Sequence, residues 1–218
     1  MPAPAIEATT PSRRQRKRHQ TLEHLVSTAL RLFEAQGYDV VTMEQIAAEA
    51  DVAKRTLYNH FPVKEALLAH WIHAQLERDL QRLAPQIERR TTFASRISYL
   101  LDVSATWCER HRAYMPPYLR FRFMSADTAI RDGAQDATAN IGNTFAALIE
   151  AGQRRGEVRT DLTAPHLATL FHHLYLGALM RWLTVPGLTL HDELRAAVKL
   201  FVEGAERSHP PSARRRHS

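Results

Sequence analysis

The spacing of apolar residues constrains this chain more than any other feature of its sequence. From Leu22 to Phe33 these residues recur three and four positions apart, which is the period of an amphipathic helix. No segment alternates apolar and polar residues as a half-buried strand would. The sequence therefore predicts an all-α protein, and the same period places further helices at roughly 64–85, 91–110, 116–124, 128–155, 164–183 and 190–206.

Two short helices are predicted directly after the first. Gly37 can end the first helix, and the segment Thr42–Gln45 has the form of a capping box, in which each side chain bonds the other's backbone N–H. The segment Lys54–Phe61 reads as a third helix, and Pro62 disfavours helix at the residue before it. Leu57 and Phe61 are four residues apart and would both pack inward. Three helices in so short a stretch predict a compact unit.

The segment from Gly37 to Leu68 carries an ordered set of motifs. A glycine and an aromatic residue are followed by a Thr-initiated helix with an Ile-Ala pair, a tight turn, Thr-Leu-Tyr-Asn-His-Phe and then Lys-Glu-Ala-Leu. In order and spacing this segment resembles the DNA-binding segment of the TetR family of transcriptional regulators. The resemblance is specific over roughly residues 20–70, and beyond that only length and helical pattern agree with the family.

The resemblance implies a domain organisation and a function. It places a three-helix helix-turn-helix domain at 19–64 and a larger helical domain for ligand binding and dimerisation at 65–206. The composition of the two ends predicts disordered basic tails at 1–18 and 207–218. Such a chain would be a cytoplasmic, ligand-responsive regulator rather than an enzyme, with no cofactor and no membrane partner. It would repress transcription as a homodimer joined through its last two helices, bind a palindromic operator and be released by a small-molecule inducer.

The DNA contact is predicted on polar side chains of the second and third helices. A recognition helix must present hydrogen-bonding and basic groups to base edges and phosphates, and no acidic residue lies between Val52 and Lys64. The resemblance implies phosphate contacts for Thr42 and Lys64. It implies phosphate contact or helix positioning for Tyr58 and His60. The candidates for reading sequence are then Lys54, Arg55, Thr56 and Asn59. The predicted contacts are Thr42, Lys54, Arg55, Thr56, Tyr58, Asn59, His60 and Lys64.

Three residues depart from the pattern of the family. Asp51 stands at the usual turn glycine, and aspartate tolerates a left-handed turn better than most residues. Ala53 and Val63 stand where capping side chains are common, and each lost cap costs about 1 kcal/mol. The fold should survive these changes, but a phosphate contact from a capping hydroxyl at position 53 is lost.

The charge of the chain supports DNA binding only weakly. Its formal net charge is +6, but both ends are basic and leave the part between them with a net charge near −2. Basic tails of this kind add affinity that depends on salt and ignores sequence. The motif, and not the composition, therefore predicts a specific DNA site.

Aromatic residues are frequent between Phe93 and Trp182, and most of them should form core. In the TetR family the equivalent helices enclose an inducer cavity, and such cavities are apolar with a few polar groups. The candidates for these polar groups include Arg96, Arg122 and Arg181. Two or more arginines in the cavity wall would indicate an anionic or carbonyl-rich ligand. The residues predicted to contact ligand are Trp107, Phe121, Phe145, His172, Tyr175 and Arg120.

Two other function classes remain open on the sequence. His70, His73 and Glu77 share one face of a helix, so a metal-sensing protein would use them and would retain metal after purification. Cys108 and His111 lie one turn apart, so a small-molecule enzyme would lose turnover on Cys108→Ala. Solvent exposure of the first set and core packing of the lone cysteine are the simpler interpretations, and neither set has a recognisable further partner. A single cysteine also excludes an intrachain disulfide, which fits a reducing compartment.

Overall fold

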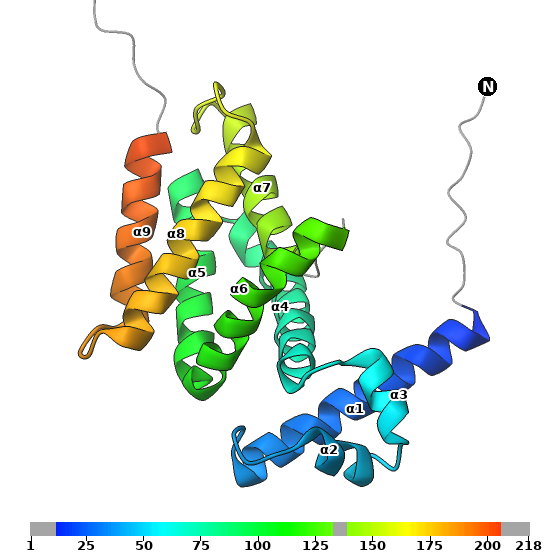
Figure 1. Cartoon of the computed structure of the whole chain (residues 1–218). Helices are drawn as coiled ribbons and strands as arrows, with labels where there is room; N and C mark the ends of the chain where they lie inside the picture. The colour runs from blue at the N-terminus through cyan, green and yellow to red at the C-terminus, as the bar shows by residue number, and fades with distance from the viewer. Residues whose placement is uncertain (1–11, 133–138, 206–218) are drawn as a thin grey trace, which may run out of the picture. The chain divides into compact units, whose positions relative to one another are not determined.

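The computed structural model describes residues 12–132 and 139–205 (Figure 1). Within those ranges the protein contains nine α-helices, one short 3-10 helix and no strand, so the predicted all-α class is confirmed. The chain forms two compact units, the first ending at Trp71 and the second beginning at Ile72. The predicted domain boundary at residue 64 lies at the start of a helix, Lys64–Glu88. The observed division falls seven residues later, within that helix. Of the described helices, none is long and apolar enough to cross a bilayer.

The first unit contains three helices and the beginning of a fourth: α1 (Arg13–Gln36), α2 (Met43–Glu49), α3 (Lys54–His60) and α4 (Lys64–Glu88). Each helix buries an apolar stripe in one small core, as the three- and four-residue spacing predicts. Leu25, Ile46 and Leu57 are fully buried there. Burying a side chain of this size stabilises the fold by about 1.5–3 kcal/mol relative to leaving it exposed.

Helix α1 begins earlier than its apolar pattern predicts. A disordered tail over residues 1–18 was expected, but the chain is helical from Arg13 onward, so that prediction is wrong for residues 13–18. The segment 13–20 offers no apolar residue that would reveal a period, yet it consists mainly of arginine, lysine and glutamine, which favour helix intrinsically. Residues 1–11 and the predicted C-terminal tail at 207–218 lie outside the described residues.

The second unit contains the rest of α4 and five further α-helices. Helices α5, α7, α8 and α9 pack side by side in it (Figure 1). A short 3-10 helix, η1, lies between α5 and α6. The elements are α5 (Phe93–Arg110), η1 (Arg112–Tyr114), α6 (Met115–Asp132), α7 (Ala139–Arg154), α8 (Ala164–Thr184) and α9 (Leu190–Ala205).

Two predicted boundaries differ from the structure. Pro85 was expected near the end of the fourth helix, but it lies inside α4, which continues to Glu88. A proline removes one helical hydrogen bond, and this one lies so close to the helix end that few later turns depend on it. The helix predicted at 128–155 is divided: residues 128–132 belong to α6, and α7 begins at Ala139.

Aromatic rings form the centre of the second unit, as expected. Phe171 packs edge-on against Phe145 with the ring centroids 4.9 Å apart, and it lies 4.7 Å from the ring of Phe201. Gly152 lies so close to this core that a Cβ atom there would be 2.7 Å from Cγ2 of Val158. These contacts join α7, α8 and α9 through side chains distant in sequence.

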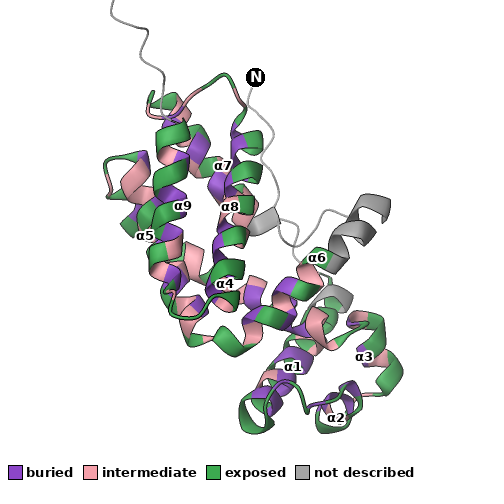
Figure 2. Cartoon of the chain, turned by 60° about the vertical axis from the view of Figure 1, so that its left-hand side comes forward, coloured by how far each residue is buried: buried purple, intermediate pink, exposed green. Residues whose placement is uncertain are grey.

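The apolar stripes of α8 and α9 lie mostly within the chain. The family resemblance implies a homodimer interface on these two helices, with part of each stripe, from Leu167 to Trp182 and from Leu194 to Ala205, as intramolecular core. In the structure most residues of both stripes are buried within the single chain, because the two helices use these faces against each other and against α5 and α7. Leu170, Met180 and Leu200 are exposed, with 46%, 46% and 63% of their surface accessible. Figure 2 shows exposed surface along both helices beside the buried faces.

Candidate nucleic-acid interface and ligand cavity

Thr42 begins α2 as the capping motif predicts. Its hydroxyl accepts a hydrogen bond from the backbone N–H of Gln45 at 3.1 Å. The Gln45 side chain does not complete the expected reciprocal bond, because it donates instead to Oε1 of Gln36 at 2.8 Å. Half of the predicted capping box therefore fixes the start of α2, and the other half links α2 to the end of α1.

The turn between α2 and α3 contains a left-handed aspartate. Asp51 has a φ of 49°, which is the conformation that the family's glycine would adopt without strain. The backbone N–H groups of Asp51 and Val52 donate to the carbonyls of Ala48 and Ala47, at 3.2 and 3.0 Å. Ala53 then begins α3 without a side-chain cap, as expected. The turn keeps its geometry despite both departures from the family pattern.

Helix α3 presents most of the predicted DNA-contacting residues. Leu57 is fully buried and fixes the inner face of the helix, while Lys54, Arg55 and Asn59 are exposed. Thr56 and His60 are half-buried at the flanks of the same helix. A seven-residue helix with one buried leucine thus offers two cations and an amide to solvent, which is the chemistry that base edges and phosphates accept.

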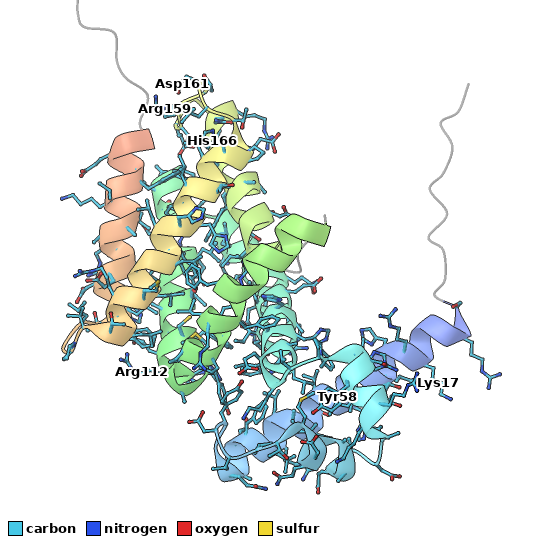
Figure 3. The ribbon with its side chains drawn as sticks, viewed as in Figure 1. Lys17, Tyr58, Arg112, Arg159, Asp161 and His166 are labelled. Atoms are coloured by element: carbon cyan, nitrogen blue, oxygen red, sulfur yellow. The ribbon has the colours of Figure 1, made fainter. Side chains whose placement is uncertain are left out.

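Tyr58 on α3 has a partner that the sequence did not reveal. Its hydroxyl donates to Oε1 of Glu44, in the first turn of α2, at 3.1 Å, and Figure 3 shows Tyr58 on α3. A backbone hydrogen bond at the helix start, together with this hydroxyl, lowers the pKa of Glu44. The same bond raises the pKa of Tyr58, so a carboxylate and a neutral phenol face each other at neutral pH. The interface therefore includes a negative charge beside α3, contributed by α2.

Lys64 is engaged by the loop between α1 and α2. Its ammonium donates to the carbonyls of Tyr38 at 2.6 Å and Val41 at 2.9 Å, and it lies 4.3 Å from the centroid of the Tyr38 ring. The sequence predicted a phosphate contact for this residue. In the structure its donors hold the loop, so a phosphate contact would require an exchange of these bonds.

The second unit contains an apolar cavity of about 80 Å³, walled mainly by α4, α5, α6 and α8. Three of the six predicted ligand contacts line it: Trp107, His172 and Tyr175. The other three lie elsewhere. Phe145 is fully buried in the aromatic core and Arg120 is exposed, while Phe121 is half-buried outside the cavity wall.

Hydrogen-bonding groups interrupt the apolar wall. The hydroxyls of Ser104 and Tyr175 lie 2.9 Å apart, and Sγ of Cys108 lies 3.7 Å from the same tyrosine oxygen. Nε2 of His73 lies 3.1 Å from the Tyr118 hydroxyl. Burial raises the pKa of Tyr175 well above its ordinary value and that of Cys108 to about 11, so both groups are neutral at pH 7. No local motif marks these pairs, because their members are 71 and 45 residues apart in the chain.

The expected arginines are not found in the cavity wall. Arg181 donates to Glu193 at 2.8 Å, and Arg96 lies 4.0 Å from the carboxylate of Glu157. Among the described residues that line the cavity there is neither a lysine nor an arginine. Arginine side chains therefore give no support to the anionic ligand that the sequence suggested.

The residues considered for metal binding have other contacts. The His70 ring packs against Phe61 with centroids 5.6 Å apart, and His73 bonds Tyr118. The part of the chain that the structure describes contains no group of three or more His, Cys, Asp or Glu residues that could hold a metal ion.

The Cys108 and His111 pair lacks the features of an activated nucleophile. Nδ1 of His111 lies 2.8 Å from the carbonyl of Trp107, and its ring stacks on that indole at 4.3 Å. A thiol with a pKa near 11 contributes almost no thiolate at pH 7, and the thiolate is the reactive form.

Comparison with known proteins shows similarity along the chain. The model of a family described as "Bacterial regulatory proteins, tetR family" matches residues 25–70. The HTH-type transcriptional regulator TcmR of Streptomyces glaucescens is 49% identical over 55 residues, which are 25% of this chain and 24% of that protein. The HTH-type transcriptional regulator HbdR of Aromatoleum sp. is 27% identical over 198 residues, covering 89% of this chain and 83% of the relative.

A solved structure extends the similarity to the fold of the second unit. FadR of Thermus thermophilus, a TetR family transcriptional repressor in complex with lauroyl-CoA, has a TM-score of 0.73 at 25% identity. The match covers 88% of this chain and 98% of that protein. These relatives are named as regulators of transcription and not as enzymes.

Proposed function

Because this chain belongs to the TetR family of transcriptional regulators, we propose that it is a repressor that binds a palindromic operator as a homodimer and is released by a small-molecule inducer. The observation that carries this proposal is α3, a short helix anchored by Leu57 that exposes Lys54, Arg55 and Asn59. A protein that acts on operator DNA must reach the chromosome, so we place it in the cytoplasm.

The exposed residues of α3 divide by chemistry. Arg55 and Lys54 suit the two acceptors of a guanine, and Asn59 suits adenine, so these residues and Thr56 are proposed to read sequence in the major groove. Tyr58, His60 and Thr42 are proposed to contact phosphates, which position the helix without reading bases. Lys64 supports the same surface by holding the loop that precedes α2.

The outer face of α8 supports the proposed homodimer. His166, Leu170, His173, Gly177 and Met180 are all exposed, and their spacing alternates between four and three residues. A Cβ atom at Gly177 would meet nothing within 4 Å, so a second helix could approach closely there. Leu200 adds an exposed apolar residue on α9. A two-fold interface between such faces gives the symmetry that a palindromic operator requires.

The cavity is the proposed inducer site, and the lauroyl-CoA complex of the solved relative supports a ligand-binding second unit. A space of about 80 Å³ is small, because a buried water needs roughly 10–15 Å³ and ligand pockets commonly reach about 300–1,000 Å³. A larger ligand must therefore widen the cavity by displacing the helices that wall it. Helix α4 is one of these, and it continues without a break from Lys64 at the end of the DNA-binding motif.

Footprinting on the intergenic DNA beside the gene tests this function, with light scattering of the same sample. We expect a dimer that protects two half-sites whose centres lie about 34–36 Å apart. Arg55→Ala should need ten- to about a hundredfold more protein to give the same footprint. A monomer at micromolar concentration, or equal binding to unrelated DNA, would contradict the proposal.

A further inference from the structure

We propose that the cavity selects neutral, mainly apolar ligands that carry a carbonyl or hydroxyl group, that Tyr175 and Ser104 bind this group, and that anions are excluded. This inference rests on the proposed function only in treating the cavity as the inducer site. It assigns the charge class of the ligand and two residues that recognise it.

The two hydroxyls form a ready-made hydrogen-bonding pair. Tyr175 comes from α8 and Ser104 from α5, and their oxygens are 2.9 Å apart in the cavity wall. When one hydroxyl donates to the other, the acceptor keeps its own proton free to donate. The nearby Cys108 sulfur, at 3.7 Å, is only a weak acceptor for that proton. A ligand oxygen can therefore replace the sulfur as the better partner.

The charges around the cavity disfavour anions. Asp79 is the one acidic residue among the described lining residues, and its carboxylate already accepts from Gln75 at 3.1 Å and from Arg82. No described lining residue is a lysine or arginine. The wall also contains two histidines: Nε2 of His73 lies 3.1 Å from the Tyr118 hydroxyl, and the ring of His172 packs edge-on against aromatic rings.

The raised pKa values of Tyr175 and Cys108 keep the phenol and the thiol neutral at pH 7. The two hydroxyls of Tyr175 and Ser104 therefore act only through hydrogen bonds.

This chemistry sets the size of the expected discrimination. A carboxylic acid with a pKa of about 4.3 is neutral in roughly one molecule in 500 at pH 7. Since only the neutral form would enter, its apparent affinity should be at least about a hundredfold weaker than that of a ketone of similar shape. The volume of about 80 Å³ admits roughly five to eight non-hydrogen atoms without rearrangement. Ring compounds of this size are therefore suitable probes.

The test is a titration of the full-length protein with cyclohexanone, cyclohexanol, methylcyclohexane, cyclohexylammonium and cyclopentanecarboxylate, followed by tryptophan fluorescence. Trp107 lines the cavity and can report occupancy, and Trp107→Phe shows which part of the signal arises there. We expect the ketone and the alcohol to bind more tightly than the hydrocarbon and both ions. Binding of the carboxylate should improve about tenfold for each unit by which the pH is lowered, as far as its pKa.

Two variants separate recognition from folding. Tyr175→Phe should reduce the preference for cyclohexanone over methylcyclohexane about tenfold, and Ser104→Ala should reduce it less. Tyr114→Phe is the matched control, because Tyr114 does not belong to the described cavity wall, and it should behave like the wild type. A carboxylate or ammonium compound that binds at pH 7 as tightly as the ketone would overturn the inference. So would an unchanged ketone preference in Tyr175→Phe.

Measuring operator affinity in the same samples separates this inference from the proposed function. If an ionic compound occupies the cavity tightly and releases DNA, the ligand class is wrong and the inducible repressor stands. If cyclohexanone shows the expected preference, the cavity chemistry stands whatever its effect on DNA, because a ligand that fits without rearrangement need not displace the walling helices. Release of DNA is therefore tested with a larger neutral ketone, cyclododecanone: if saturating amounts leave operator affinity unchanged, the inducer role falls alone.

Discussion

Helix α3 and the cavity of the second unit use polar side chains in opposite ways. On α3, Lys54 and Arg55 are charged and exposed, and a small core beneath them holds the helix in place. In the cavity, Ser104 and Tyr175 are neutral and bonded to each other within an apolar wall. A charge is inexpensive where water or a phosphate can surround it and costly where neither can. The two regions therefore suit a polyanion and an uncharged small molecule, respectively.

The largest loss of operator affinity is expected from substitutions on the outer faces of α8 and α9. In the proposed dimer these faces hold two protomers together, so that both α3 helices can bind one operator. Leu170→Asp combined with Leu200→Asp should yield a monomer and lower operator affinity at least about a hundredfold, because binding of the second half-site is no longer intramolecular. Light scattering and fluorescence anisotropy measure the two effects. Phe123→Asp, on the exposed surface of α6, is the control and should remain a dimer. A dimeric double variant would refute the proposed face.

Arg55→Ala tests the charged region directly. Operator affinity should fall ten- to about a hundredfold, or about 1–3 kcal/mol, with a changed base preference, because a bidentate contact to guanine is lost. Tyr175→Phe should leave ligand-free operator affinity unchanged, since its hydroxyl belongs to the neutral region. An equal loss on unrelated DNA would assign Arg55 to phosphates instead.

Lys17→Gln should have a smaller and uniform effect. Lys17 is exposed on α1 (Figure 3), among the basic residues predicted to add sequence-blind affinity. Every duplex should bind a few-fold more weakly, and the slope of log affinity against log salt should fall by about 0.9. Arg31→Gln is the control, because Arg31 already pairs with Glu49 at 2.9 Å. Altered base preference in Lys17→Gln would contradict a purely electrostatic role.

The smallest effect is expected at Glu44, the carboxylate that accepts from Tyr58. Glu44→Gln should strengthen binding to all DNA about two- to fivefold, in the range of an exposed charge interaction. Because the pKa of Glu44 is lowered, its charge is constant across neutral pH and the gain should be the same at pH 6 and pH 8. Glu203→Gln, on the exposed end of α9, should change nothing. Weaker binding by Glu44→Gln would show that Glu44 mainly positions Tyr58.

The first unit could be predicted because its signals are local. The capping threonine at 42, the turn at Asp51 and the burial of Leu57 all follow from residues within a few positions, and the structure contains each of them. The limits are local as well. The apolar period could not reveal the polar start of α1, and nothing near Lys64 indicated that carbonyls more than twenty residues earlier hold its ammonium.

The cavity could not be predicted, because distant segments form it. Trp107, His172 and Tyr175 were chosen as aromatic or polar residues in helices of the right unit, and the same reasoning also chose Phe145, which is core. Arginines were expected inside, but carboxylates elsewhere in the second unit pair with several of them, as Glu193 does with Arg181. Such pairings depend on packing between helices, which the helical period does not encode.

Specific DNA binding by α3 is tested most directly by one affinity ratio. The full-length protein is titrated at fixed salt against the intergenic duplex beside its gene and against a duplex of the same composition in scrambled order. A sequence-reading recognition helix predicts a preference of at least about a thousandfold for the intergenic duplex. A preference below about tenfold would mean that the exposed cations of α3 bind phosphates alone, and it would contradict an operator-specific repressor.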